Sequence, residues 1–200
     1  MSAVAGTPGT RERLLDAARG LIEEEGYGGA SVAAIAERAG VAAGTLYRHF
    51  PSKADLFLEV FRVVCSGEER AMQAAAAEAG PAAADRLEAV LTTFARRALQ
   101  NRRLAWALLA EPVDPLLDAE RLAYRERYAA LVADELTAAI EAGEIPPQDV
   151  AFTAAALVGG CGEALVGPLS SVDGPEQVLA SIQTFARRAI GAAPSPSSAA

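Results

Sequence analysis

The chain has few of the side chains that most often perform catalysis or bind metals. It contains one histidine, His49, and two cysteines, Cys65 and Cys161, which lie far apart in the sequence. A single histidine leaves almost nothing with which to build a Ser-His-Asp triad or a zinc site. No phosphate-cradling glycine loop is visible, and adjacent carboxylates such as Glu68 and Glu69 diverge by about 100° on a helix, so they do not share a site. We therefore expect no enzymatic activity, no metal and no cofactor.

Long apolar runs are also missing. No stretch of about 18 uninterrupted apolar residues is present, which argues against a transmembrane helix. The N-terminus lacks the charged-then-apolar pattern of a signal peptide. The two cysteines lack metal-ligand spacing, and we interpret them as buried free thiols in a reducing compartment. These absences predict a cytoplasmic chain that does not associate with a membrane.

Aromatic residues make up only 6% of the chain, whereas apolar residues make up 52% and alanine is abundant. This composition favours helices over strands, so we predict an all-α fold. The net charge of −8 is unevenly distributed, because residues 1–54 contain six basic and six acidic side chains and the rest contains 12 basic and 20 acidic ones. An acidic body would turn the neutral, locally basic N-terminal end toward a polyanion.

Residues 31–53 carry the most informative pattern, SVAAIAERAGVAAGTLYRHFPSK. Ser31 can cap a short helix with one apolar face, and Gly40 fits the left-handed end of that helix. A second short helix follows, buried through Leu46 and Phe50, and its polar side chains are available to a partner. Such a helix-turn-helix, with positive charge gathered at its second helix, fits a DNA major groove. Spacing alone would also suit an ordinary helical hairpin.

The string GTLYRHFPSKADL, from Gly44 to Leu56, resembles the end of the DNA-binding domain of the tetracycline-repressor (TetR) family. The family pattern is G-T-L-Y-x-H-F-x-S-K-x-x-L, and the chain agrees with it at every motif position. The resemblance is specific over about residues 10–60 and extends beyond them only as an all-helical architecture. It implies an N-terminal three-helix helix-turn-helix DNA-binding domain followed by a helical ligand-binding and dimerisation domain.

Composition and helix signals place the boundaries of these parts. We expect a flexible arm (residues 1–9), the helix-turn-helix DNA-binding domain (10–53), the helical effector-binding and dimerisation domain (54–191) and a disordered tail (192–200). Outside the motif we predict helices over residues 10–25 and 53–79, between Pro81 and Asn101, over 102–111, from Asp114-Pro115 to Gly143, and over 148–166 and 175–190.

The polar side chains around the motif are the expected contacts with a double-stranded DNA operator. They are Ser31, Thr45, Tyr47, Arg48, His49 and Lys53. Thr45 and Arg48 can reach base edges or adjacent phosphates. The other side chains can donate to phosphate oxygens or lie at helix starts, where backbone phosphates commonly bind.

The resemblance also implies a small-molecule site among the middle helices and a homodimer built from the last two long helices. Large rings with polar tips suit ligand pockets, which makes four residues the candidates for its lining: Phe94, Trp106, Tyr124 and Tyr128. The candidates for the dimer interface are Leu157, Gly160, Leu165, Val178, Ile182 and Phe185. Either set could instead complete the chain's own core.

Together these features predict a ligand-responsive DNA-binding transcriptional regulator. Repression is the usual behaviour of the family, so the resemblance implies that a dimer binds a palindromic operator and releases it when a small molecule of unknown identity binds. The ligand would move the long helix that starts at Lys53. The alternative from another class is a helical protein-interaction module that does not bind DNA.

Overall fold

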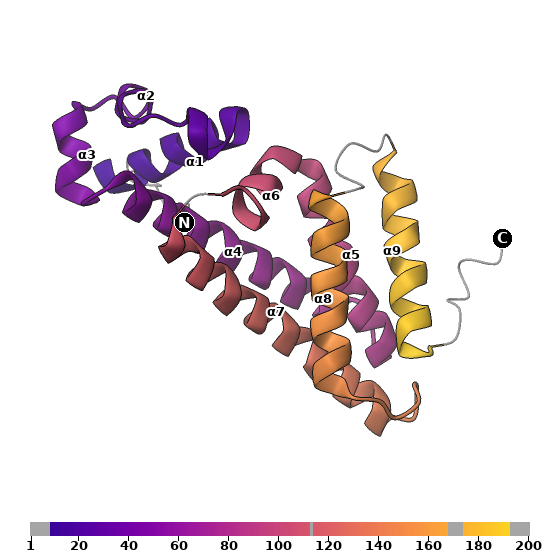
Figure 1. The fold of residues 1–200 in the computed structure, drawn as a ribbon. Coiled ribbons are helices and arrows are strands. Elements are labelled where there is room, and N and C mark those ends of the chain that lie inside the picture. The colour runs from indigo at the N-terminus through magenta and orange to yellow at the C-terminus, as the bar shows by residue number, and fades with distance from the viewer. Residues whose placement is uncertain (1–8, 113, 168–173, 193–200) are drawn as a thin grey trace, which may run out of the picture.

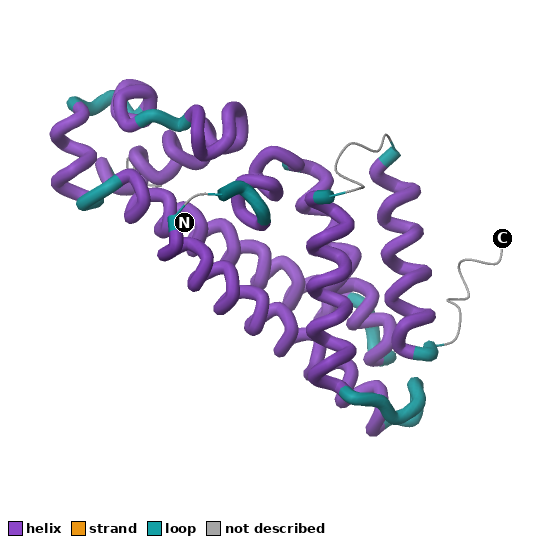
Figure 2. The backbone as a smooth tube through the Cα atoms, in the orientation of Figure 1, coloured by secondary structure: helices purple, strands orange, loops and turns teal. Residues whose placement is uncertain are grey.

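A computed structural model of the chain describes residues 9–112, 114–167 and 174–192, and every regular element in these ranges is an α-helix (Figures 1 and 2). The helices are α1 (Thr10–Gly29), α2 (Val32–Arg38), α3 (Ala43–His49), α4 (Lys53–Glu78), α5 (Ala83–Gln100), α6 (Arg102–Leu109), α7 (Pro115–Glu141), α8 (Val150–Val166) and α9 (Pro175–Ile190). The predicted all-α fold is confirmed. Most of the predicted flexible arm and disordered tail lies outside the described residues.

Helices α1, α2 and α3 form the small N-terminal domain, at one end of the molecule in Figure 1. The side chain of Ser31 accepts a hydrogen bond from the Ala34 N–H at 3.1 Å, which caps α2 as predicted. Gly40, with φ of 66°, makes the turn between α2 and α3, in a conformation that favours glycine. Leu46 and Phe50 are buried in the hydrophobic core, which continues from this domain into the rest of the molecule.

The end of α1 is irregular. Gly26 has φ of 77° and ψ of 178°, so the regular helix stops there and residues 27–29 form a separate turn. This agrees with the predicted end near residue 25. The turn leads directly into Ser31 and α2, and it also approaches the segment after α6.

The long helix α4 joins the two halves of the molecule (Figure 1). Its 26 residues span about 39 Å at 1.5 Å per residue. Ser52 caps it by accepting from the Asp55 N–H at 3.1 Å, as the predicted capping box requires. Its first turns pack against α1, and the rest packs against α5 and α7.

Helix α5 is the centre of the larger domain, because it contacts α4, α6, α7, α8 and α9. Its inward face is fully buried through Leu87, Val90, Leu91 and Ala95. Helix α7 runs beside α4, and α8 and α9 cover one side of the bundle (Figure 1). Among the described residues, no helix combines the length and apolarity needed to cross a membrane.

Candidate DNA interface and ligand cavity

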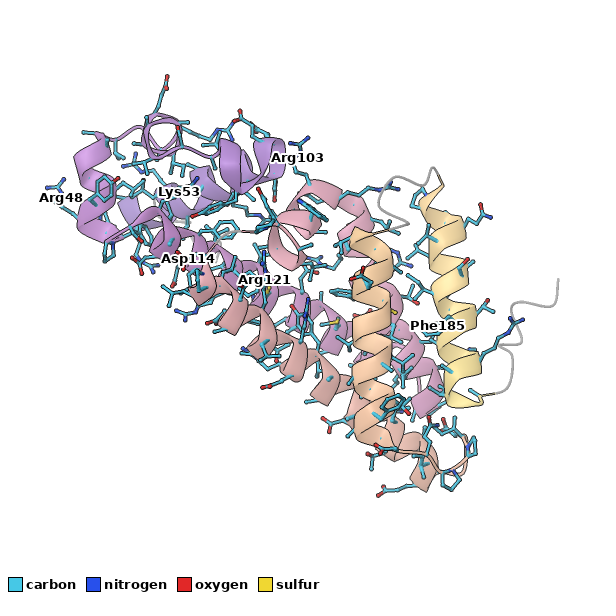
Figure 3. The ribbon with its side chains drawn as sticks, in the orientation of Figure 1. Arg48, Lys53, Arg103, Asp114, Arg121 and Phe185 are labelled. Carbon is cyan, nitrogen blue, oxygen red and sulfur yellow. The ribbon has the colours of Figure 1, made fainter. Side chains whose placement is uncertain are left out.

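The exposed face of α3 carries four of the predicted DNA contacts. Tyr47 is 54% exposed, and Arg48 and His49 are exposed beside it. The Arg48 side chain projects from the end of the molecule (Figure 3) and donates to the Thr45 hydroxyl at 3.0 Å. The structure therefore gathers Thr45, Tyr47, Arg48 and His49 on one short helix that stands clear of the body. Their role as DNA contacts stays a prediction.

Several arginines of this domain are paired with carboxylates, whereas among the described residues Arg48 on α3 is not. Arg11 pairs with Glu59 at 2.9 Å, and Arg38 pairs with Glu24 at 2.6 Å. Arg48 has no carboxylate partner within the part of the chain that the structure describes. An unpaired guanidinium on an exposed helix is free to pair with a phosphate or a base.

Lys53 has a structural contact that the sequence did not reveal. Its ammonium Nζ donates to the Tyr27 carbonyl at 2.7 Å and lies 4.1 Å from the centre of the Tyr27 ring. Burial lowers the pKa of Lys53, and the nearby Glu111 carboxylate opposes that shift. The lysine thus fastens the start of α4 to the turn at the end of α1. An ammonium has three donors, so two of them stay available to a phosphate.

A cavity of about 240 Å³ lies among α4, α5, α6, α7 and α8. Three of the four predicted lining residues, Phe94, Tyr124 and Tyr128, are on its wall. The fourth, Trp106, does not line this cavity. Trp106 is 45% exposed because α6 turns Leu104, Ala107 and Leu108 inward instead.

The aromatic wall of the cavity is fixed to the backbone of α4. The Tyr128 hydroxyl donates to the Cys65 carbonyl at 3.1 Å, and the Tyr124 hydroxyl donates to the Arg62 carbonyl at 3.2 Å. Burial raises the pKa of the Tyr128 hydroxyl well above its ordinary value, so the ring stays neutral. Burial also raises the pKa of the Cys65 thiol to about 12. The wall is therefore neutral and largely apolar at physiological pH.

Charged groups also border the cavity. Arg97 forms a two-point ion pair with Glu68, and this partner raises the pKa of the guanidinium. Arg125 is exposed and lines the cavity, as does Glu163. A ligand would thus meet an apolar chamber bordered by both signs of charge, a composition typical of small-molecule sites.

Arg121 is one of the cavity residues that sequence reasoning missed. It is 9% exposed, and its Nε and Nη2 donate to the carbonyls of Leu108 (2.7 Å), Ala107 (3.0 Å) and Glu111 (2.7 Å). The signal was its register, because Leu117, Arg121, Tyr124 and Tyr128 follow one buried face of α7. A charged residue in that register indicates a buried polar contact.

The predicted dimer residues separate into two groups. Leu157, Leu165, Val178 and Ile182 are at most 5% exposed and complete the core of the chain itself, so they cannot offer apolar surface to a partner. Gly160 and Phe185 are exposed, and so is Phe152 on α8, at 72%. The exposed apolar surface of α8 and α9 therefore includes Phe185 from the predicted set and Phe152, which was not predicted.

Two family models match the chain. "Bacterial regulatory proteins, tetR family" matches residues 14–60, and "Tetracyclin repressor-like, C-terminal domain" matches residues 80–165. The transcriptional repressor KstR of Rhodococcus jostii is 52% identical over 48 residues, which are 24% of this chain and 23% of KstR. KstR2 of the same organism is 32% identical over 123 residues, 60% of this chain and 58% of KstR2. The chain thus matches about a quarter of KstR and somewhat more than half of KstR2.

Solved structures share the fold over nearly the whole chain. The fatty acid degradation regulator FadR of Bacillus halodurans superimposes with a TM-score of 0.76 at 20% identity, covering 90% of this chain and 95% of that one. FadR of Bacillus subtilis, solved in complex with stearoyl-CoA, has a TM-score of 0.73 at 24% identity, covering 87% of this chain and 96% of that one. At these identities the likeness is one of fold.

Proposed function

Because the chain belongs to the TetR family of bacterial regulatory proteins, we propose that it is a ligand-responsive transcriptional repressor. A homodimer binds a palindromic operator and releases it when a small molecule enters the cavity. The observation that carries this proposal is the pairing of an exposed helix α3, with its unpaired Arg48, and a separate apolar cavity, both joined to α4. We place its action in the cytoplasm, where its DNA target lies.

In the proposed complex, α3 enters the major groove. Arg48 and Thr45 reach base edges, while Tyr47 and His49 donate to phosphates. Ser31 and Lys53 bind phosphates on either side, at the starts of α2 and α4. Lys53 does so with the ammonium donors that the Tyr27 carbonyl leaves free.

The proposed dimer pairs α8 and α9 with their copies. The exposed rings of Phe152 and Phe185 supply apolar area, and Gly160 allows close approach, because an added Cβ there would meet nothing within 4 Å. A two-fold axis through this face would set the two α3 helices about one DNA turn apart, roughly 34 Å.

The proposed ligand has an acyl chain and an anionic head, as in an acyl-CoA. An apolar chamber suits the chain, and Arg125 at its border suits the head. The fold shared with a FadR that was solved with stearoyl-CoA supports this class. The volume of about 240 Å³ is slightly below the range of drug-sized pockets, about 300–1,000 Å³, which favours a short or medium chain.

The test begins with selection of bound sequences from random duplex DNA, followed by titration of the selected operator at two salt concentrations. We expect a palindromic site, two chains per duplex and affinity that falls steeply with salt. A panel of acyl-CoAs from acetyl to stearoyl, with free CoA and free fatty acids as controls, should then release the operator. If no duplex is retained even at low salt, the protein-interaction module replaces this proposal.

A further inference from the structure

The turn at the end of α1, residues 27–29, is tied to a residue far away in the sequence. The Glu111 carboxylate accepts from the Tyr27 N–H at 3.1 Å and from the Gly28 N–H at 3.3 Å. Gly26 lies beside this carboxylate and makes the turn with φ of 77°, a conformation that favours glycine. One carboxylate from the larger domain therefore satisfies two backbone amides of the helix-turn-helix domain.

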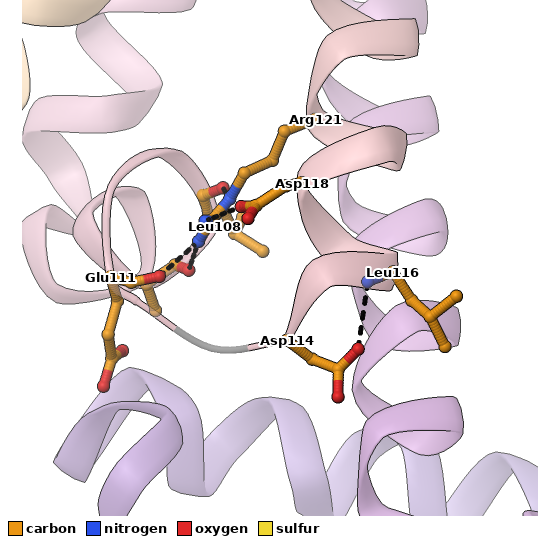
Figure 4. Close-up of polar contacts among 7 residues, drawn as sticks. Leu108, Glu111, Asp114, Leu116, Asp118 and Arg121 are labelled. Atoms are coloured by element: carbon orange, nitrogen blue, oxygen red, sulfur yellow. Dashed lines mark hydrogen bonds and ion pairs between the residues drawn. The ribbon is translucent and has the colours of Figure 1, made fainter.

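The main chain of Glu111 is held from the opposite side. Figure 4 shows its carbonyl accepting from Arg121, while its carboxylate points away from that guanidinium. The same guanidinium donates to the carbonyls of Ala107 and Leu108, which end α6. Arg121 thus fixes the last turn of α6 and Glu111 as one unit.

This unit is also part of the cavity wall. Leu108, Leu109, Ala110 and Arg121 all line the cavity, and Glu111 is the next residue. A ligand that enlarges the cavity or competes for the Arg121 donors would displace the backbone that carries Glu111. The displacement would reach the DNA-binding domain without passing along α4.

The turn that the Glu111 carboxylate holds is linked through Tyr27 to α3, the helix proposed to enter the major groove. The Tyr27 carbonyl accepts from Lys53, and its ring packs edge-on against Phe57 with ring centres 4.5 Å apart. Lys53 follows α3 after a three-residue connection. The position of the turn therefore affects the position of α3.

We propose that Arg121 and Glu111 position the helix-turn-helix from the cavity wall, Arg121 acting through Glu111. The inference rests on the proposed function in one respect: it takes the linked arrangement to be the one that binds the operator. The ligand weakens DNA binding by breaking the contact between Glu111 and the Tyr27–Gly28 amides.

A double-mutant cycle in the full chain tests this without a ligand. The variants are Glu111→Ala, Arg121→Met and their combination, with Glu126→Ala and Arg103→Met as controls on exposed positions of α7 and α6. Fluorescence anisotropy measures operator affinity, and hydrogen exchange measures protection of the Tyr27 and Gly28 amides. Arg121→Lys, which keeps the charge and some donors, replaces Arg121→Met if that variant does not fold.

Each single variant should weaken operator binding by about five- to fifty-fold, within the range typical of coupling between two sites. Each should also speed exchange at the two amides, and the double variant should be no worse than Glu111→Ala alone. Arg121→Lys should be intermediate, and the controls should match wild type. Equal or tighter operator binding, additive losses, or unchanged exchange in Arg121→Met would overturn the proposal. If wild type binds no duplex, the proposed function fails, and the exchange measurement alone decides the link between Arg121 and Glu111.

Discussion

Replacing Gly162 by leucine should stabilise the chain by filling the cavity. Gly162 lies in α8 and lines the cavity, and an added Cβ would meet no atom within 4 Å. Leucine is a better helix former than glycine by about 0.8 kcal/mol. Full burial of its side chain contributes about 1.5–3 kcal/mol, and we count half of this because the position is half-buried.

The expected gain for Gly162→Leu is therefore about 2 kcal/mol, or roughly 4–8 °C in Tm for a chain of this length, measured at fixed protein concentration. Gly162→Ala is the matched control, because it gains helix propensity and fills little space. It should stabilise by about 0.8 kcal/mol. If the leucine variant is less stable than the alanine variant, the space is already filled and the reasoning fails, since overpacking costs about 1–3 kcal/mol.

Three further predictions concern DNA contacts, a cavity thiol and the dimer. Tyr47→Phe should weaken binding to all DNA sequences and flatten the salt dependence of the affinity. Arg48→Met should instead change which bases are selected, and a uniform loss of affinity would assign Arg48 to contacts with the DNA backbone. Burial raises the pKa of Cys65 to about 12 and disfavours the thiolate, so at pH 8 this thiol should be alkylated about three orders of magnitude more slowly than an unperturbed thiol of pKa about 8.5. Mass spectrometry of the folded protein measures the rate of alkylation, and fast labelling of Cys65 would contradict its burial. Phe185→Glu should give a folded monomer in light scattering, because the ring is 47% exposed and charge would oppose its pairing; a persistent dimer would move the interface elsewhere.

The sequence predicted the helices well where their signals are local. Ser31, Ser52, Asn101 and Asp114 all cap the helices that follow them. Gly26 and Gly143 have positive φ where helices were predicted to stop. Local signals work because a cap and the amide that it satisfies lie within a few residues of each other.

Contacts between distant residues were not predictable in this way. Helix α5 has no local side-chain cap, and its Ala83 and Ala84 amides are satisfied by Glu144 at 3.2 and 2.9 Å. The Glu111 carboxylate likewise accepts hydrogen bonds from the Tyr27 and Gly28 amides. Nothing in the spacing of these glutamates indicates their partners, because the folded chain alone brings them together.

The candidate sites show the same division. The exposed polar face of α3 follows from its sequence, because Leu46 is the apolar residue that the helix buries. The direction of Trp106, in contrast, depends on which face α6 turns toward α1 and the cavity. Four of the five apolar side chains predicted for the dimer interface are buried, since periodicity marks the inward face of a helix and does not distinguish a core from a partner. Phe185, which was predicted, and Phe152, which was not, are the exposed rings on α9 and α8.

The connection between cavity and operator is tested most directly by one displacement titration. Operator-bound wild type and Gly162→Leu are titrated in parallel with the acyl-CoA that is most effective in the panel, and anisotropy reports release. We predict that the ligand releases the operator from wild type but not from the filled variant, although both bind DNA equally well without it. Equal release from both proteins would show that the ligand acts outside the cavity and would contradict the account.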